Sequence, residues 1–130
     1  MSSQPDAYPL LVAVRDQLAA VPGVLTCRIG WEAAITPDDY PLVRIVPNRM
    51  RDGRSIGRRS VDAVVYFGRP IHEFENGLEA LYAEVMAMES ALITAAEQTP
   101  GVAVLYRETI LDEDRNDAYK LFGLVVEIVG

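Results

Sequence analysis

The chain has little of the side-chain chemistry on which most enzymes depend. Its 130 residues include one histidine, His72, and one cysteine, Cys27. A single cysteine excludes an internal disulfide and is typical of a reducing compartment. Cys27 lies in an alternating apolar run, which predicts a buried structural thiol. A single histidine excludes any zinc motif with two histidines, and position 76, where the second one would fall after His72-Glu73, is asparagine.

Other catalytic and targeting signals are also missing. There is no serine in a Gly-x-Ser-x-Gly turn and no glycine-rich phosphate loop. No apolar run reaches the roughly 18 residues that a membrane span needs. The first residues lack a basic region followed by an apolar stretch, so we expect no signal peptide. Paired carboxylates for acid–base catalysis come together only in the folded chain, so the sequence does not exclude them. The sequence therefore favours a binding or assembly protein over an enzyme, with no cofactor and no metal.

Charge is distributed unevenly along the chain. The formal net charge is −7, yet the stretch from Arg49 to Arg59 contains five arginines and one aspartate and sums to +4. The arginines are Arg49, Arg51, Arg54, Arg58 and Arg59. Two glycines and the lack of an apolar period predict a mobile loop here. Such a loop suits contact with nucleic acid or with the acidic body of an identical neighbour, although charge runs are often simply solvated.

The apolar periods predict seven elements in the order α-β-β-β-α-β-β. The first helix covers about 6–21, with Asp6 as its cap. Asn76 and Glu79 form a capping box for the second helix, and Thr99-Pro100-Gly101 ends it. The strands cover about 24–29, 41–47, 60–68, 102–111 and 118–129.

This order predicts one α+β domain over residues 1–130. We expect a two-layer sandwich in which a five-stranded antiparallel or mixed sheet carries both helices on one face. The residues predicted to be buried are Val14, Leu18, Val43, Ile45, Val65, Leu81, Val85, Leu92, Val104, Leu124 and Val126.

An acidic turn is predicted between the last two strands. Asp112, Asp114 and Asn116 stand where the first ligands of a calcium loop would, but Asp117 replaces the glycine that makes the sharp turn there. We therefore predict a solvated hairpin turn that calcium leaves unaffected. Its acidic residues Asp112, Glu113, Asp114 and Asp117 are a candidate acceptor for the arginines of another subunit.

A resemblance to a known family rests on two sequence motifs and two strand pairs. Asp39-Tyr-Pro-Leu-Val-Arg-Ile-Val-Pro47, the strand pair after it, Phe74-Glu-Asn-Gly-Leu-Glu-Ala-Leu-Tyr-Ala-Glu84 and the final strand pair resemble the tail-terminator (tail-completion) proteins of tailed bacteriophages. The likeness covers nearly the whole chain as an order of elements. It implies a homo-oligomer, usually a hexameric ring, that caps the tail tube and joins it to the head. No enzymatic residue is implied.

The resemblance sets the expected partners and location. They are identical copies, the tail tube protein and the head–tail connector proteins, without a membrane. The expected location is the virion, after assembly in the bacterial cytoplasm. The arginines either contact a neighbouring copy or line a channel and touch DNA phosphates without sequence preference. The alternatives are another head–tail joining protein of the neck, or a small cytoplasmic ligand-binding domain or enzyme.

Overall fold

The computed structural model describes residues 6–32, 34–39, 41–52, 58–70, 77–112 and 119–130. Two helices, five strands and one 3-10 turn appear in the predicted order, which confirms the α-β-β-β-α-β-β sequence of elements. They are α1 (Tyr8–Ala19), β1 (Thr26–Ile29), η1 (Pro37–Asp39), β2 (Leu42–Asp52), β3 (Arg59–Pro70), α2 (Leu78–Glu97), β4 (Ala103–Asp112) and β5 (Tyr119–Val129).

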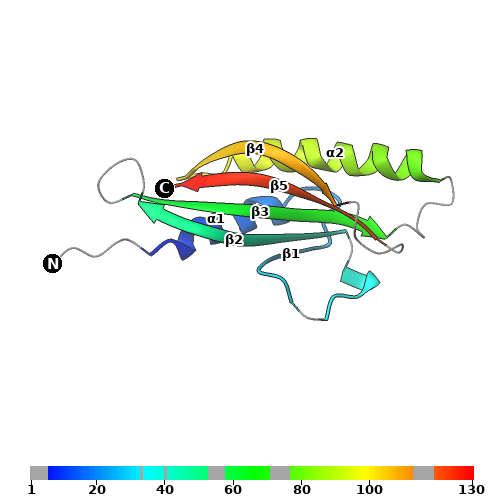
Figure 1. The fold of residues 1–130 in the computed structure, drawn as a ribbon, viewed down its shortest axis with the longest axis horizontal. Coiled ribbons are helices and arrows are strands. Elements are labelled where there is room, and N and C mark those ends of the chain that lie inside the picture. The colour runs from blue at the N-terminus through cyan, green and yellow to red at the C-terminus, as the bar shows by residue number, and fades with distance from the viewer. Residues whose placement is uncertain (1–5, 33, 40, 53–57, 71–76, 113–118) are drawn as a thin grey trace.

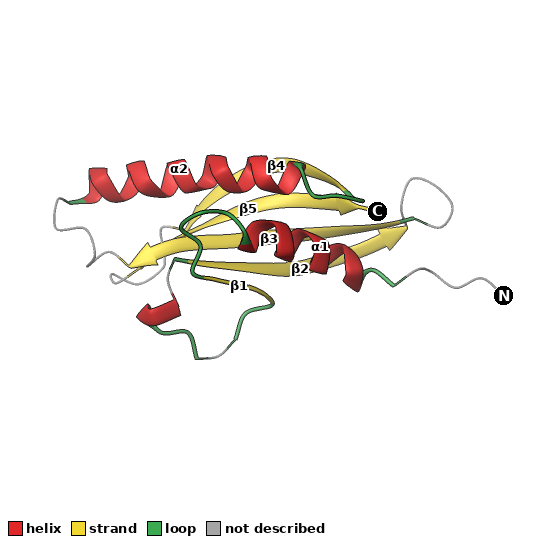
Figure 2. Ribbon diagram, turned by 180° about the vertical axis from the view of Figure 1, so that it is seen from behind, coloured by secondary structure: helices red, strands yellow, loops and turns green. Residues whose placement is uncertain are grey.

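The strands form one mixed sheet in the order β1-β2-β3-β5-β4. The short strand β1 runs parallel to β2, and every other neighbouring pair is antiparallel. Figure 1 shows the sheet as a long twisted layer, with α1 and α2 behind it. From the other side, both helices lie in front of the sheet (Figure 2), which confirms the predicted two-layer α+β sandwich.

The core lies between the sheet and the two helices. In β3, alternate residues from Val61 to Phe67 point into it, and in β5 alternate residues from Phe122 to Ile128 do the same. A strand in a sheet that packs only one face against the core buries every second residue, as seen here. All eleven residues that the sequence predicted to be buried are buried.

The two helices begin differently from the sequence prediction. The cap predicted at Asp6 is wrong, because the N-cap of α1 is Ala7 and no side chain caps this helix. Asp6 accepts a hydrogen bond from the backbone N–H of Tyr8 at 2.9 Å. The capping box predicted for α2 is wrong. The residue at the helix start is Gly77, whose φ of 94° suits glycine, and no side chain caps the helix there. Asn76 lies outside the described residues.

The predicted loop from Arg49 to Arg59 is wrong at both ends, because β2 extends to Asp52 and β3 begins at Arg59. Met50 pairs with Val61, and Asp52 pairs with Arg59. The pairing of β2 with β1 ends at Ile45, so the rest of β2 has a free edge, where Pro47 costs no hydrogen bond to a neighbour. A bulge follows between Pro47 and Arg49. Residues 53–57, the middle of the segment expected to be mobile and including Arg54, lie outside the described part of the chain.

Among the described residues, the segment after β1 covers one end of the sheet face opposite the helices. Ile35, in the segment after β1, packs against the buried side chains of Leu42 and Leu121. Further along this outer face, Val64, Tyr66 and Val125 are only partly buried. No helix in the described ranges combines the length and apolarity needed to cross a membrane.

Candidate assembly surfaces

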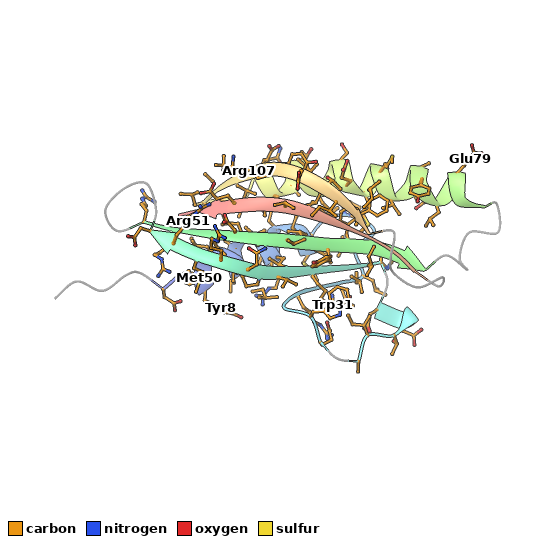
Figure 3. All side chains as sticks on the ribbon, in the orientation of Figure 1. Tyr8, Trp31, Met50, Arg51, Glu79 and Arg107 are labelled. Carbon is orange, nitrogen blue, oxygen red and sulfur yellow. The ribbon has the colours of Figure 1, made fainter. Side chains whose placement is uncertain are left out.

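Four of the five predicted site arginines fall within the described residues. Arg49 and Arg51 lie on β2, Arg59 begins β3, and Arg58 directly precedes it. The structure thus brings these arginines together at one end of a two-stranded ribbon. Figure 3 shows Met50 and Arg51 at that end, away from the start of α2. Arg49, Met50 and Arg58 are exposed. Arg49 pairs with Asp62 and lies on the sheet face away from the helices, whereas Met50 pairs with the core residue Val61 and lies on the helix face.

Arg51 belongs to an ion-pair network on the outer face of the sheet. Its Nη2 lies 2.8 Å from Asp62 Oδ1 and 3.6 Å from Glu127 Oε2. Glu127 is almost fully buried, accepts a hydrogen bond from Ser60 Oγ at 2.7 Å, and is paired with Arg107. These contacts link β2, β3, β5 and β4, so the network stabilises the pairing of four strands. Part of the predicted partner-seeking cluster is therefore satisfied within one chain.

The hydrogen bonds that Glu127 accepts fix its protonation state. The hydrogen bond from Ser60 and then the one from Arg107 lower the pKa of the Glu127 carboxyl. Both favour the charged form over the protonated one. At neutral pH Glu127 is ionised and has donors on both oxygens, which suits a structural role.

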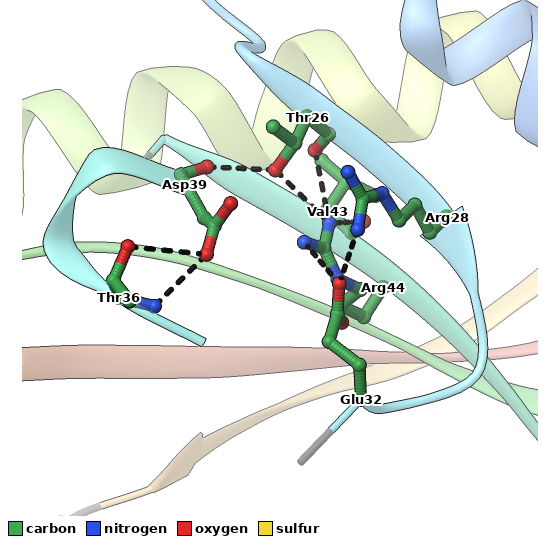
Figure 4. A network of polar contacts seen from close by, with 7 residues as sticks. All are labelled: Thr26, Arg28, Glu32, Thr36, Asp39, Val43 and Arg44. Atoms are coloured by element: carbon green, nitrogen blue, oxygen red, sulfur yellow. Dashed lines mark hydrogen bonds and ion pairs between the residues drawn. The ribbon is translucent and has the colours of Figure 1, made fainter. Parts of the chain in front are cut away.

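A second network holds the segment after β1 against the sheet (Figure 4). Arg44 is fully buried, and its Nε and Nη2 donate to the two Glu32 oxygens at 2.6 and 3.1 Å. Arg44 Nη1 also donates to Thr26 Oγ1 at 3.1 Å. Arg28 approaches Glu32 from the exposed side at 2.8 Å. The hydrogen bond from Arg44 is the main reason that the pKa of Glu32 is lowered. Sequence reasoning missed this network because Glu32 and Arg44 meet only across the loop between them.

The other candidate groups within the described residues offer no reactive centre. Cys27 is partly buried and not fully buried as predicted. This burial raises the pKa of the Cys27 thiol to about 11, which suits a structural thiol. Its Sγ lies 3.5 Å from the backbone oxygen of Arg15. His72 lies outside the described residues. Among the residues that the structure does describe, no group of His, Cys, Asp and Glu side chains could hold a metal ion.

The predicted acidic acceptor is mostly outside the described part of the chain. Asp112 ends β4, whereas Glu113, Asp114 and Asp117 fall in the gap at 113–118. Their role as a contact for arginines stays a prediction. A different acidic surface is well described. Helix α2 has four glutamates and no lysine or arginine. The signal for this surface was present in the sequence.

The outward part of α2 has one large apolar side chain between its acids. Met86 is 51% exposed, and Glu79, Ser90 and Glu97 are exposed as well. Spacings of seven, four and seven residues place these four side chains along one side of the helix. They are hereafter called the helix surface.

Strand β4 is a second exposed apolar feature. Leu105 and Tyr106 are each 37% exposed, Ile110 is 48% exposed and Leu111 is 45% exposed. Because β4 is the last strand of the sheet, its outer edge has no neighbouring strand within the described residues. The pairing with β5 places Leu105 and Ile110 on one face of the sheet and Tyr106 and Leu111 on the other. Apolar side chains therefore flank this edge on both sides.

Comparison with known proteins adds no assignment. No protein-family model matches the chain, and no curated protein matches it.

Proposed function

We propose that this protein is a bacteriophage assembly protein that works as a homo-oligomeric ring at the end of the tail tube. The exposed apolar edge strand β4 is the observation that carries this proposal. Natural sheets protect their edges with charges, prolines or short strands. The ten-residue strand β4 has a bulge with exposed Arg107 and Glu108 at its middle, but on either side of the bulge it exposes Leu105, Tyr106, Ile110 and Leu111. An exposed apolar patch of this kind marks a surface that a partner covers.

The state of the two carboxylates bound by arginines, the partly exposed Glu32 and the buried Glu127, supports an assembly role over catalysis. A general acid at neutral pH needs a raised pKa, and the pKa values of Glu32 and Glu127 are both lowered. Each carboxylate is held by arginines in an arrangement that ties strands or a loop together. These features serve a rigid subunit.

The element order supports the choice of a tail protein. It is the order on which the resemblance to tail terminators rests, and it includes the long β2–β3 ribbon. A ring of identical copies needs two different patches on each chain, because each copy meets the next head to tail. The apolar edge of β4 and the charged surfaces described above provide different patches. The tail tube protein and the head–tail connector proteins are the partners for the remaining faces.

The experiment uses a phage genome from which this coding sequence has been removed, with the protein supplied in trans. Ile110→Lys combined with Leu105→Lys should leave the far-ultraviolet circular dichroism unchanged. Electron microscopy should show tails of uncontrolled length or tails without heads. Ala34→Lys, at an exposed position outside β4, is the matched control and should restore normal virions. Normal virions with the β4 double variant would refute the proposal.

A further inference from the structure

The two edges of the sheet are protected to different degrees. Beyond Ile45 the free edge of β2 contains Pro47, a bulge and two exposed arginines, Arg49 and Arg51. Proline, bulges and charges are the features by which natural sheets prevent a further strand from adding. Strand β4, the outermost strand on the other side (Figure 1), also has a bulge, but the two charges there are of opposite sign and apolar side chains flank them. Within the described residues, β4 is therefore the edge more open to a further strand.

The hydrogen bonds inside the sheet show which backbone groups of β4 point to its free edge. Arg59 and Gly130 donate their backbone N–H groups to each other's oxygens at 3.2 and 3.0 Å, so they form a hydrogen-bonded pair between β3 and β5. Every second pair along these strands is of the same kind, which includes the core-facing residues of β5. Those residues bond to β3, so their partners in β4 direct their N–H and C=O groups away from β5. These partners are Val104, Tyr106, Thr109 and Leu111.

The bulge in β4 allows the strand to pair antiparallel with β4 of a second copy. Paired antiparallel strands place side chains of the same sheet face opposite each other. In a regular strand, a twofold axis between two adjacent residues breaks this rule, because it sets residues of opposite faces against each other. The bulge between Tyr106 and Glu108 adds one residue and shifts the alternation by one position. A twofold axis between Arg107 and Glu108 therefore keeps opposite residues on a common face.

On the outer face of the sheet, this register brings together complementary side chains. Leu105 lies opposite Ile110 of the second copy, and both are exposed apolar side chains. At the centre Arg107 lies opposite Glu108, which is exposed and has no ion pair within the described ranges. Sliding one strand by two positions sets Leu105 opposite Glu108. Sliding it the other way sets Ile110 opposite Arg107, so both shifts place an apolar side chain against a charge.

On the helix face, the same register matches a second row of side chains. Val104 lies opposite Leu111 of the second copy, and Tyr106 lies opposite Thr109. These are the residues whose backbone groups point to the free edge, so each pair can exchange two hydrogen bonds. Tyr106 and Leu111 are 37% and 45% exposed, so α2 leaves this side of the edge accessible to a second strand.

We propose that two free copies of this chain pair β4 with β4 and join their sheets about a twofold axis between Arg107 and Glu108. The contact is isologous, since the same strand serves on both copies, and it closes after two copies. Its biological consequence rests on the proposed function. The dimer covers the edge that the ring uses, so the dimer is the resting form, and assembly on the tail tube separates its two copies.

Disulfide trapping tests the register. In a Cys27→Ser background, one protein carries Leu105→Cys and a second carries Ile110→Cys. Opposite residues that share no hydrogen bond have Cα atoms about 4.5 Å apart, which is within the range for a disulfide. Mild oxidation of the mixture should give a covalent dimer at least about tenfold faster than Leu105→Cys alone, whose two thiols lie about 16 Å apart along the strands.

A chain with both cysteines distinguishes this contact from a ring contact. The twofold axis brings both cysteine pairs together in one dimer, so oxidation should stop at the dimer. A ladder of higher oligomers would show that β4 contacts a different patch, and it would overturn the proposal. The control pairs Leu105→Cys with Glu108→Cys, which lies on the same face but in a shifted register. Equal crosslinking in that control would overturn the proposal as well.

Charge exchange tests the centre of the contact. Glu108→Arg sets two arginines opposite each other, so self-association in sedimentation velocity should weaken about tenfold or more. Glu79→Arg, on the helix surface, makes the same change in net charge away from β4 and should stay within about twofold of the original protein. Mixing Glu108→Arg with Arg107→Glu should restore the dimer, because arginines of one chain then meet glutamates of the other. A Glu108→Arg dimer as strong as the original would overturn the proposal.

The disulfide-locked dimer separates this contact from the phage role. It should leave tail tubes uncapped until a reductant opens it. Capping by the locked dimer would overturn its assignment as the resting form, because the ring would then not use the β4 edge. If the dimer locks as predicted but the reduced chain never caps tails, the dimer stands and the phage role fails. If tails are capped and no dimer forms at any concentration, the phage role stands and the dimer fails.

Discussion

Removing the exposed partner of a buried charge should destabilise this fold more than removing the buried charge itself. Arg44 is fully buried, and the Glu32 side chain beside it is 29% exposed. Glu32→Ala leaves the Arg44 guanidinium buried without its carboxylate, whereas Arg44→Met removes that cation and fills much of its volume. Breaking a buried pair from one side costs about 3–5 kcal/mol, and the partial exposure of Glu32 reduces this to about 2–3 kcal/mol.

Arg44→Met should cost only about 1 kcal/mol. Replacement of buried ionic groups by apolar ones of similar size is often close to neutral. Glu32 would keep its ion pair with Arg28 and its access to water. Arg28→Met is the control. It removes an exposed partner of the same carboxylate and should cost less than about 1 kcal/mol.

Urea unfolding measures all three variants. Trp31 is the only tryptophan, it is next to Glu32, and its ring lies 5.5 Å from that of Tyr66, so its fluorescence reports on the site. With an m-value of about 1.5 kcal/mol per molar urea, Glu32→Ala should lower the midpoint by about 1–2 M. Circular dichroism should give the same midpoint. A larger loss for Arg44→Met than for Glu32→Ala would refute the reasoning, as would a fluorescence transition that precedes the dichroism transition.

Three further predictions concern the core and the outer face. Leu81→Ala should lower the free energy of unfolding by about 2–5 kcal/mol in the same assay, since it leaves a cavity at a buried position; a change below about 1 kcal/mol would place Leu81 outside the core. Gly123→Ala should cost about 1–3 kcal/mol, because its Cβ would lie 2.8 Å from Val64 Cγ1, and Val64→Ala in the same chain should recover part of that loss; no recovery would contradict the clash. The lowered pKa of Glu127 means that its contribution to stability is complete above the ordinary value of 4.5 and is lost as the pH falls through the lower native pKa. Glu127→Gln should therefore flatten the acid side of the stability profile, and an unchanged profile would show that Glu127 is not the group responsible.

The sequence predicted the core well because the buried apolar residues of a helix or strand recur at a regular spacing along the chain. Leu81, Val85 and Leu92 recur at helical spacing, and Val43 and Ile45 alternate along a strand. Each of them is buried. The period of apolar side chains and the Pro-Gly pairs between elements were enough to order the elements and to place both helices on one face.

The end of the β2–β3 ribbon was mispredicted because its charged residues hide the alternation of apolar and polar side chains that is typical of a strand. Arg49 and Arg51 alternate with Met50 along β2, but one apolar residue among arginines gives no clear strand signal. The pairing becomes evident only from β3, where Val61 lies opposite Met50. Runs of charged residues are typical of solvated loops, but here Arg49 to Asp52 pair with β3 as a strand.

The polar networks could not be predicted from one sequence. Ser60 and Glu127 are 67 residues apart, and only the pairing of β3 with β5 brings them together. Glu32 and Arg44 meet because a parallel strand pair folds their loop back over the sheet. The acidic helix is different, since its four glutamates without a basic residue were visible in the sequence from the start.

Electron microscopy of the protein with purified tail tubes tests the central claim most directly. The account predicts a ring of copies at one end of each tube, and rings without tubes at high protein concentration. The variant with Leu105→Lys and Ile110→Lys should leave the tube ends bare, whereas the Ala34→Lys control should cap them as the original protein does. Bare tube ends with the original protein, together with a monomer at every concentration, would contradict the account.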